Sequence, residues 1–145
     1  MNLRKRFAIS LSLFALAGLA ATAANAQTVL RGDFTLAEQA YWCNTLLPAG
    51  GYTLSLVRQP SGINMVFVKG EGLEATFMAP SNAEEVSERS VLKVDEINGT
   101  RVIRELDAGF LGKSYRFAVS KAVREMTLSG SIAKPLTVAL ESKGE

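Results

Sequence analysis

The chain has 145 residues, with 16 Lys and Arg against 14 Asp and Glu, one Cys and no His. This length allows one ordinary domain and excludes a multidomain enzyme. The absence of His excludes imidazole catalysis and most zinc sites, and a single Cys excludes a disulfide within the chain.

The first 26 residues have the pattern of a secretory signal peptide. Three basic residues at positions 4–6 precede an apolar stretch of about 13 residues, which is shorter than the roughly 20 that a membrane-spanning helix needs. The segment ends Ala-Asn-Ala at positions 24–26, which is typical of a cleavage site before Gln27. We therefore expect an exported protein, periplasmic or secreted, with an uncleaved N-terminal anchor as the alternative.

Cleavage after Ala26 changes the charge balance. It removes three basic residues and no acidic one, leaving 13 Lys and Arg against 14 Asp and Glu, a net charge of −1. The basic excess belongs to the export signal, so the mature chain gives no argument for binding nucleic acid. We also expect no stable membrane span after cleavage.

The first part of the mature chain predicts a three-stranded meander. Residues 51–57 alternate, with Tyr52, Leu54 and Leu56 on one side. The next two strands are expected to bury Ile63, Met65 and Phe67, and then Leu73, Ala75 and Phe77. The turn residues at 58–62 and 69–72 separate the strands. The pattern predicts one buried face.

The strongest local signal is a hairpin over 91–106. Asn98-Gly99 lies between two β-prone runs and is typical of a type I′ turn. A further strand is predicted over 113–119, and a short apolar run follows at 136–140. That run indicates either a last edge strand or a frayed tail.

Together these segments predict an all-β fold. We expect one antiparallel β-sandwich or barrel of about 7 to 8 strands over residues 27–145, following a signal peptide at 1–26. Residues 127–145 are expected to be a loosely packed tail or an edge strand.

Residues 34–54 read FTLAEQAYWCNTLLPAGGYTL. This segment resembles a group of small exported bacterial all-β domains of uncharacterised function that carry the pattern F-x-[LV]-P-F-x-[VF]-x-[WVA]-G-x-x-x-L-P-A-G-x-Y-x-[VFL]. The matching positions are Phe34, Leu36, Trp42, 47–50 and Tyr52. The later hairpin and the 115–117 strand look similar in order, although only L-P-A-G-x-Y is specific. The resemblance implies a compact β-domain outside the cytoplasm and assigns no catalytic residue.

Two positions depart from this pattern. Ala37 stands in place of Pro, and Cys43 stands in place of a Gly in a turn. A Cys held at positive φ would carry strain of about 1 kcal/mol or more. The thiol of Cys43 could be buried, free and reactive, or paired with another chain.

The L-P-A-G unit also has a structural interpretation. Leu47 enters the core, Pro48 presets the turn, and Gly50 supplies backbone freedom before Tyr52.

Two patterns that resemble catalytic motifs have simpler interpretations. Residues 107–114, DAGFLGKS, are one residue away from a phosphate-binding loop, but a strand is expected to follow, so no helix N-terminus would receive the anion. Carboxylates and basic residues gather around the hairpin, where cross-strand ion pairs account for them. These residues are Asp95, Glu96, Glu105, Asp107, Lys93, Arg101 and Arg104.

Tyr41 and Trp42 are the candidate contact residues for a ligand or partner. Adjacent strand residues face opposite sides, so at most one of them belongs to the core and the other is exposed.

We expect a non-enzymatic exported domain, a monomer without metal or cofactor, that binds or scaffolds an envelope protein or glycan. One alternative is a carboxylate-dependent hydrolase of envelope or extracellular glycans. Another is a self-associating structural subunit that uses residues 136–140 as an edge or exchanged strand.

Overall fold

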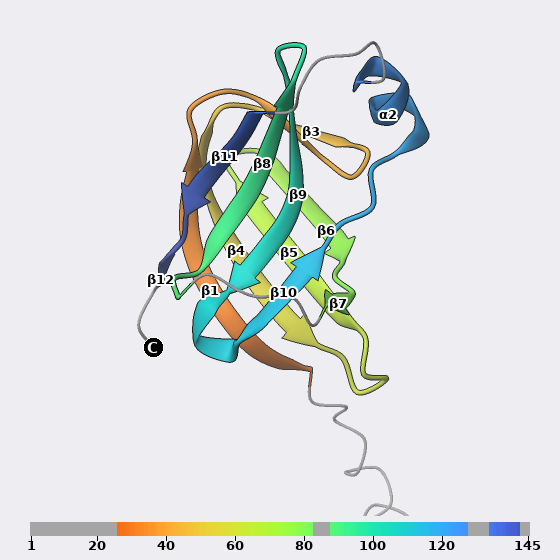
Figure 1. The fold of residues 1–145 in the computed structure, drawn as a ribbon. Helices are drawn as coiled ribbons and strands as arrows, with labels where there is room; N and C mark the ends of the chain where they lie inside the picture. Colours follow the sequence, from red (N-terminus) through yellow and green to blue (C-terminus); the bar gives the residue numbers. More distant parts are fainter. Residues whose placement is uncertain (1–25, 83–87, 128–133, 143–145) are drawn as a thin grey trace, which may run out of the picture.

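The computed structural model describes residues 26–82, 88–127 and 134–142 (Figure 1). The predicted signal peptide therefore lies outside the described residues except for Ala26. Over the described ranges, no helix has both the length and the apolar character needed to cross a bilayer.

The first sheet has five strands, in the order β12-β1-β4-β5-β6. Their bounds are β1 Gln27–Leu36, β4 Gly50–Arg58, β5 Asn64–Gly70, β6 Leu73–Met78 and β12 Glu141–Ser142. In β4 the side chains of Tyr52, Leu54 and Leu56 are buried and the residues between them are not, as the sequence alternation predicts. The meander β4-β5-β6 is antiparallel throughout.

The second sheet has seven strands, with the main order β11-β8-β9-β10-β7. Their bounds are β7 Ser81–Asn82, β8 Val91–Ile97, β9 Thr100–Ala108, β10 Lys113–Arg116 and β11 Lys134–Ala139. The short strand β2 (Ala40–Trp42) pairs in parallel with β9 and antiparallel with β3 (Thr45–Leu47). A 3-10 turn, Gly109–Leu111, joins β9 to β10, and a single short helix of the described residues, α2, spans Lys121–Thr127.

The predicted hairpin is confirmed. Strands β8 and β9 pair in antiparallel fashion on either side of Asn98 and Gly99. Both turn residues have positive φ, 52° at Asn98 and 76° at Gly99, as a type I′ turn requires.

The predicted all-β class is confirmed, but the number of strands is larger than the expected 7 to 8, and several of them are very short. The strands β2, β3, β7 and β12 have only two or three residues each, too few to leave a period in the sequence. The long strand β1 was missed although the burial of residues 30–36 alternates, because Gly32 occupies one of its inward positions and leaves a gap in the apolar period.

The predicted burial in β5 is wrong. Val66 and Val68 are buried, whereas Ile63 and Phe67 are exposed and Met65 is half-buried. This strand is apolar on both faces, so alternation alone does not select its inward side. The register set by the pairing of Arg58 with Asn64 selects it instead.

The core lies between the two sheets and is centred on aromatic side chains. Trp42 stacks on Phe77 with ring centroids 5.0 Å apart and meets Phe117 edge-on at 4.9 Å. Phe34 stacks on Tyr52 at 5.4 Å and also approaches Trp42. Five aromatic side chains from both sheets thereby form one cluster.

The end of the described chain links the two sheets. Strand β11 is an edge strand of the second sheet, and after Leu140 the strand β12 joins the edge of the first sheet beside β1 (Figure 1). Gly32 permits this close approach, because a Cβ there would lie 3.1 Å from the carbonyl oxygen of Glu141 and 3.1 Å from Cδ2 of Leu140. Residues 127–145 were expected to be a loosely packed tail or an edge strand. The structure shows that residues 134–139 of this segment form an edge strand.

Candidate binding groove between the two sheets

The structure separates the two predicted contact residues, Tyr41 and Trp42. Trp42 is completely buried in the aromatic cluster, so its ring is a core element. Tyr41 is half-buried and keeps part of its surface accessible. Of the pair, only Tyr41 can meet a partner in this conformation.

Cys43 follows directly in the turn between β2 and β3. Its φ is 54°, the positive value that the glycine in the related pattern indicates. The thiol is free and half-buried, and burial raises its pKa above the ordinary value. A raised pKa lowers the fraction of thiolate near neutral pH, so the environment of Cys43 does not activate it as a nucleophile.

The carboxylates near the hairpin are held in ion pairs. Lys93 Nζ lies 2.8 Å from Glu105 Oε1 and 3.1 Å from Asp107 Oδ2, and Arg116 Nε lies 3.5 Å from Glu105 Oε2. The side chains of Glu105 and Asp107 are only 7% and 0% exposed. The hydrogen bond to Glu105 and the charge of Asp107 raise the pKa of Lys93, against an opposing effect of burial.

The remaining charges of the hairpin follow the same pattern. Arg101 Nε lies 2.9 Å from Glu96 Oε2, and Arg104 Nε lies 3.8 Å from Asp95 Oδ2. The interpretation as cross-strand ion pairs is confirmed.

The segment 107–114 forms the connection between β9 and β10. Gly112 adopts the left-handed conformation at the end of the 3-10 turn, with φ of 59°, and β10 begins at Lys113. A strand stands where a phosphate-binding loop needs the start of a helix. The interpretation of this segment as a turn is confirmed.

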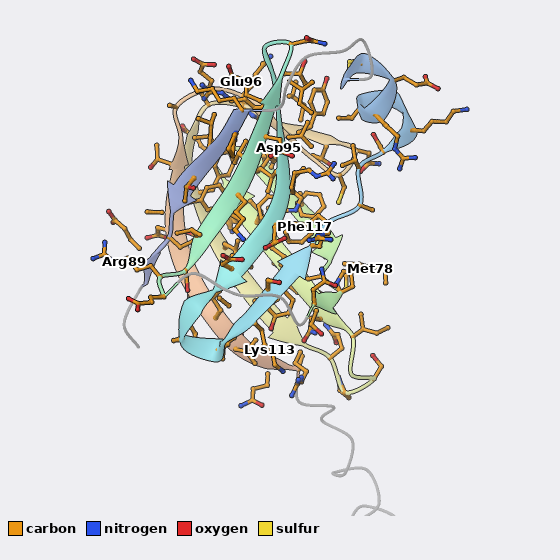
Figure 2. The ribbon with its side chains drawn as sticks, in the orientation of Figure 1. Met78, Arg89, Asp95, Glu96, Lys113 and Phe117 are labelled. Carbon is orange, nitrogen blue, oxygen red and sulfur yellow. The ribbon has the colours of Figure 1, made fainter. Side chains whose placement is uncertain are left out.

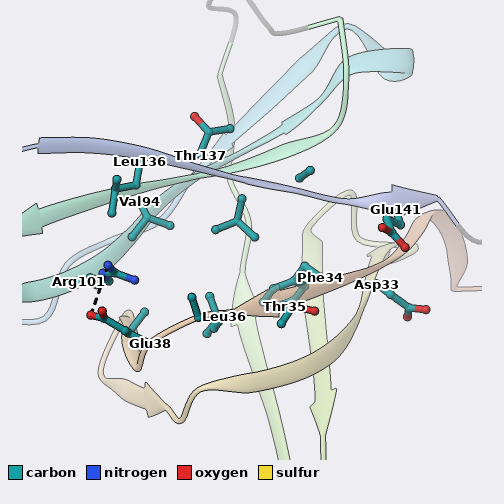
Figure 3. Close-up of a pocket in the computed structure, with 14 residues that line it drawn as sticks. Asp33, Phe34, Thr35, Leu36, Glu38, Val94, Arg101, Leu136, Thr137 and Glu141 are labelled. Atoms are coloured by element: carbon teal, nitrogen blue, oxygen red, sulfur yellow. Dashed lines mark ion pairs between the residues drawn. The ribbon is translucent and has the colours of Figure 1, made fainter.

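A groove of about 480 Å³ lies between β1 and β11 (Figure 3). Residues 33–36 of β1 form one wall, and residues 136–139 of β11 form the other. The chain crosses between the sheets at each end, through residues 37–39 before β2 and through Leu140 before β12. The groove is therefore a slot between two strands that belong to different sheets.

Both walls of the groove are strand edges. Strand β11 pairs with β8 along one edge, and no described strand pairs with its other edge. On its groove side β1 pairs with β12 only at Gly32 and Asp33, so residues 34–36 have no strand neighbour there among the described residues. Backbone groups of an unpaired edge are available for pairing with another chain.

The floor of the groove is apolar. Phe34, Leu36 and Val94 reach it from the core, and Leu136 and Val138 line it from β11 (Figure 3). A slot of this size with an apolar floor falls within the range of known ligand sites.

Charged groups stand at the two ends of the groove. At one end Arg101 Nη2 lies 3.3 Å from Glu38 Oε2, while its Nε contacts Glu96 (Figure 3). At the other end Asp33 and Glu141 occupy directly opposite positions on β1 and β12. Asp33 Oδ1 also accepts a hydrogen bond of 2.7 Å from Thr53 Oγ1.

A second, smaller hollow of about 310 Å³ lies on the outer face of the first sheet. Phe67, which is 40% exposed, stands among Arg31, Lys69 and Glu74 there, and Lys69 and Glu74 form an exposed ion pair of 2.9 Å. Met78 projects at the margin of the molecule beside β6 (Figure 2).

The groove was not predicted from the sequence. Its walls come from β1 and β11, which are about 100 residues apart in the chain, and the sequence analysis did not predict β1. One signal was present: the apolar run at 136–140 was interpreted as a possible edge strand. No protein-family model, curated protein or solved structure matches this chain.

Proposed function

We propose that this chain is a non-enzymatic exported binding domain that holds a partner at the cell envelope, and that the groove between β1 and β11 is its site. One observation carries the proposal: an apolar slot of about 480 Å³ is bounded by two strand edges that, at residues 34–36 of β1 and 136–139 of β11, have no further strand neighbour among the described residues. Unpaired edges are usually protected in proteins, and here two of them border one apolar floor.

The other polar and reactive groups considered above have environments that favour a structural role. Glu105 and Asp107 are engaged by Lys93. The thiol of Cys43 has a raised pKa, and Trp42 is core. The groove has no competing role in the described structure, so it is the feature that a binding function best explains.

Site-specific photocrosslinking tests this function. A photoreactive p-benzoylphenylalanine replaces Thr137 in the groove wall, or, as a matched control, Thr76 on the outer face of β6; both side chains are exposed. Irradiation in envelope extract is expected to give a discrete adduct from position 137 and none from position 76. Equal labelling from both positions, or none from 137, would contradict the proposal.

A second candidate is the glycan hydrolase, favoured by the two acidic residues Asp33 and Glu141, which occupy paired register positions on β1 and β12 and line one end of the groove. Glycosidases use two carboxyl groups that are roughly 5 to 10 Å apart. Release of reducing ends from envelope glycans, abolished by either Asp33→Asn or Glu141→Gln, would support this candidate. Absence of release by the unmodified chain would exclude it for those substrates.

A third candidate is self-association through β11, favoured by its position at the sheet edge. Light scattering over a wide concentration range decides it. A strict monomer at high concentration would exclude it, and a dimer lost in the variant Val138→Pro would support it.

A further inference from the structure

We propose that β12 is a releasable latch on the edge of β1, and that the partner is a protein segment in extended conformation that pairs with β1 once β12 is released. This inference rests on the proposed binding function and names both the class of partner and the part of the chain that moves. It follows from the burial of the groove floor, the shortness of β12 and the anchoring of Leu140.

The floor of the groove offers little surface to an occupant. Phe34, Leu36 and Val94 are only 3%, 4% and 3% exposed. Leu136 and Val138 pack against this core from β11 and are themselves half-buried. The accessible parts of the groove are therefore chiefly its two strand edges, whose backbone N–H and C=O groups can pair with another polypeptide backbone.

The edge of β1 that borders the groove is divided by β12. Past Asp33 the unpaired part is residues 34–36, which span about 10 Å. Strands usually have about five to six residues, so this part is too short for a strand of ordinary length. With β12 released, the free part that borders the groove runs from Gly32 to Leu36 and spans about 17 Å. A partner strand of ordinary length therefore requires the release of β12.

The pairing that holds β12 is short. This strand is Glu141–Ser142 and pairs with β1 only at Asp33 and Gly32, whereas β4 pairs with the other edge of β1 from Gln27 to Leu36. The side chain of Glu141 is exposed. A two-residue strand with few buried contacts belongs to the least stable parts of a fold. We therefore expect β12 to open without unfolding of either sheet.

Leu140 fixes the point about which β12 moves. Its backbone N–H donates a hydrogen bond of 3.0 Å to the carbonyl oxygen of Ser90, directly before β8. Strand β11 pairs with β8 as far as Ala139. The chain up to Leu140 is thus attached to the second sheet, and only β12 crosses to the edge of β1 (Figure 1). Movement after Leu140 frees β1 and leaves the β11 wall of the groove in place.

The pairing of β12 also indicates how the partner lies. Strand β12 is antiparallel to β1, so this edge already accepts an antiparallel strand from the chain itself. Addition of a strand to a sheet edge depends mainly on main-chain hydrogen bonds. We expect the partner segment to run antiparallel to β1 and to be recognised chiefly through its backbone.

A disulfide across the latch tests its role. Asp33→Cys with Glu141→Cys replaces a directly opposite pair, and such pairs have Cβ atoms about 4.5–5.5 Å apart, near the range that a disulfide accepts. Cys43→Gly removes the native thiol from both proteins. The matched control is Lys69→Cys with Glu74→Cys, a directly opposite pair on the outer face. The oxidised and reduced forms of each protein are compared.

The probe is acetyl-Thr-Val-Thr-Val-Thr-amide, titrated into isotope-labelled protein. The reduced latch variant is expected to bind it with a Kd of about 1 mM and to shift the backbone amides of Thr35 and Leu36. Oxidation of the latch is expected to weaken binding about tenfold, because β12 then stays on Gly32 and Asp33. Oxidation of the control is expected to change nothing. The same peptide N-methylated at every internal amide cannot pair with a strand edge and is expected not to bind.

Glu141→Pro with Ser142→Pro tests the latch in the opposite direction. Proline has no backbone N–H, so this variant removes both donors of β12. It is expected to bind the peptide about threefold more tightly than the unmodified protein, because the closed state no longer competes. Circular dichroism checks that each variant is folded.

Each other outcome overturns the inference. Equal binding to the oxidised and reduced latch, with no gain in the proline variant, would show that β12 does not control the edge. Equal binding of the N-methylated peptide would show that backbone pairing is not the mode of recognition. If position 137 crosslinks a partner but the peptide does not bind at about 10 mM, the binding function stands and the extended segment does not. If the same amides shift only with increasing protein concentration, the occupant is a second copy of this chain.

Discussion

The ring of Tyr52 lies directly over Gly70, its cross-strand partner on β5, in the space that a side chain of residue 70 would occupy. The hydroxyl of Tyr52 donates a hydrogen bond of 2.6 Å to the carbonyl oxygen of Pro48. Tyr52 thus ties the turn before β4 to the neighbouring strand. This pairing gives the L-P-A-G-x-Y segment a structural role, together with the buried Leu47 and the φ of 147° at Gly50.

We expect Gly70→Ala to destabilise the protein by about 2 kcal/mol, because a Cβ would collide with a buried aromatic ring. Gly51→Ala is the matched control: a Cβ at Gly51 meets no atom within 4 Å. Urea unfolding measures both. An equal effect of the two substitutions would show that the Tyr52 ring is free to move away.

We expect Cys43→Gly to be more stable than Cys43→Ala by about 1 kcal/mol, because residue 43 has positive φ and only glycine adopts it without strain. Both variants remove the thiol, so their difference isolates the backbone conformation. Urea unfolding at one pH measures it. Equal stability of the two variants would contradict a left-handed conformation at this position.

We expect the thiol of Cys43 to react slowly with iodoacetamide at pH 8, because burial raises its pKa and lowers the thiolate fraction. The rate should keep rising with pH above the ordinary titration range of a cysteine. Protein unfolded in urea provides the control and should react at the rate of an ordinary thiol. Faster reaction in the folded state would indicate an activated thiol.

We expect Lys93→Met to destabilise the protein by about 2 kcal/mol, since it leaves the buried carboxylates of Glu105 and Asp107 without their shared ammonium group. The figure allows for the partial exposure of Lys93 itself. The triple variant Lys93→Met, Glu105→Gln, Asp107→Asn should recover part of the loss because it removes the buried charges. No recovery in urea unfolding would mean that packing, and not charge, is what Lys93 supplies.

Local patterns predicted the parts of this fold that local chemistry determines. Asn98-Gly99 specified its hairpin because few other residues accept positive φ twice in succession. The predicted buried face of β5 was wrong because the sequence of this strand is apolar on both sides, and its register depends on pairing with β4. The groove depends on β1 and β11 lying at facing edges, a long-range arrangement that no window of the sequence contains.

We expect the stabilising effect of Tyr52 to be lost at alkaline pH. Burial raises the pKa of Tyr52 above its ordinary value of 10.0, so the folded state holds the phenolic proton more tightly than the unfolded chain. The contribution is complete below pH 10 and disappears as the pH rises through the folded pKa. Tyr52→Phe should cost about 1 kcal/mol at pH 7 through the lost hydrogen bond to Pro48, and the difference from the unmodified protein should shrink above pH 10. Tyr41→Phe, at a half-buried tyrosine on β2 in the second sheet, is the matched control. A constant difference between Tyr52→Phe and the unmodified protein from pH 7 to pH 11, measured by urea unfolding, would contradict this linkage.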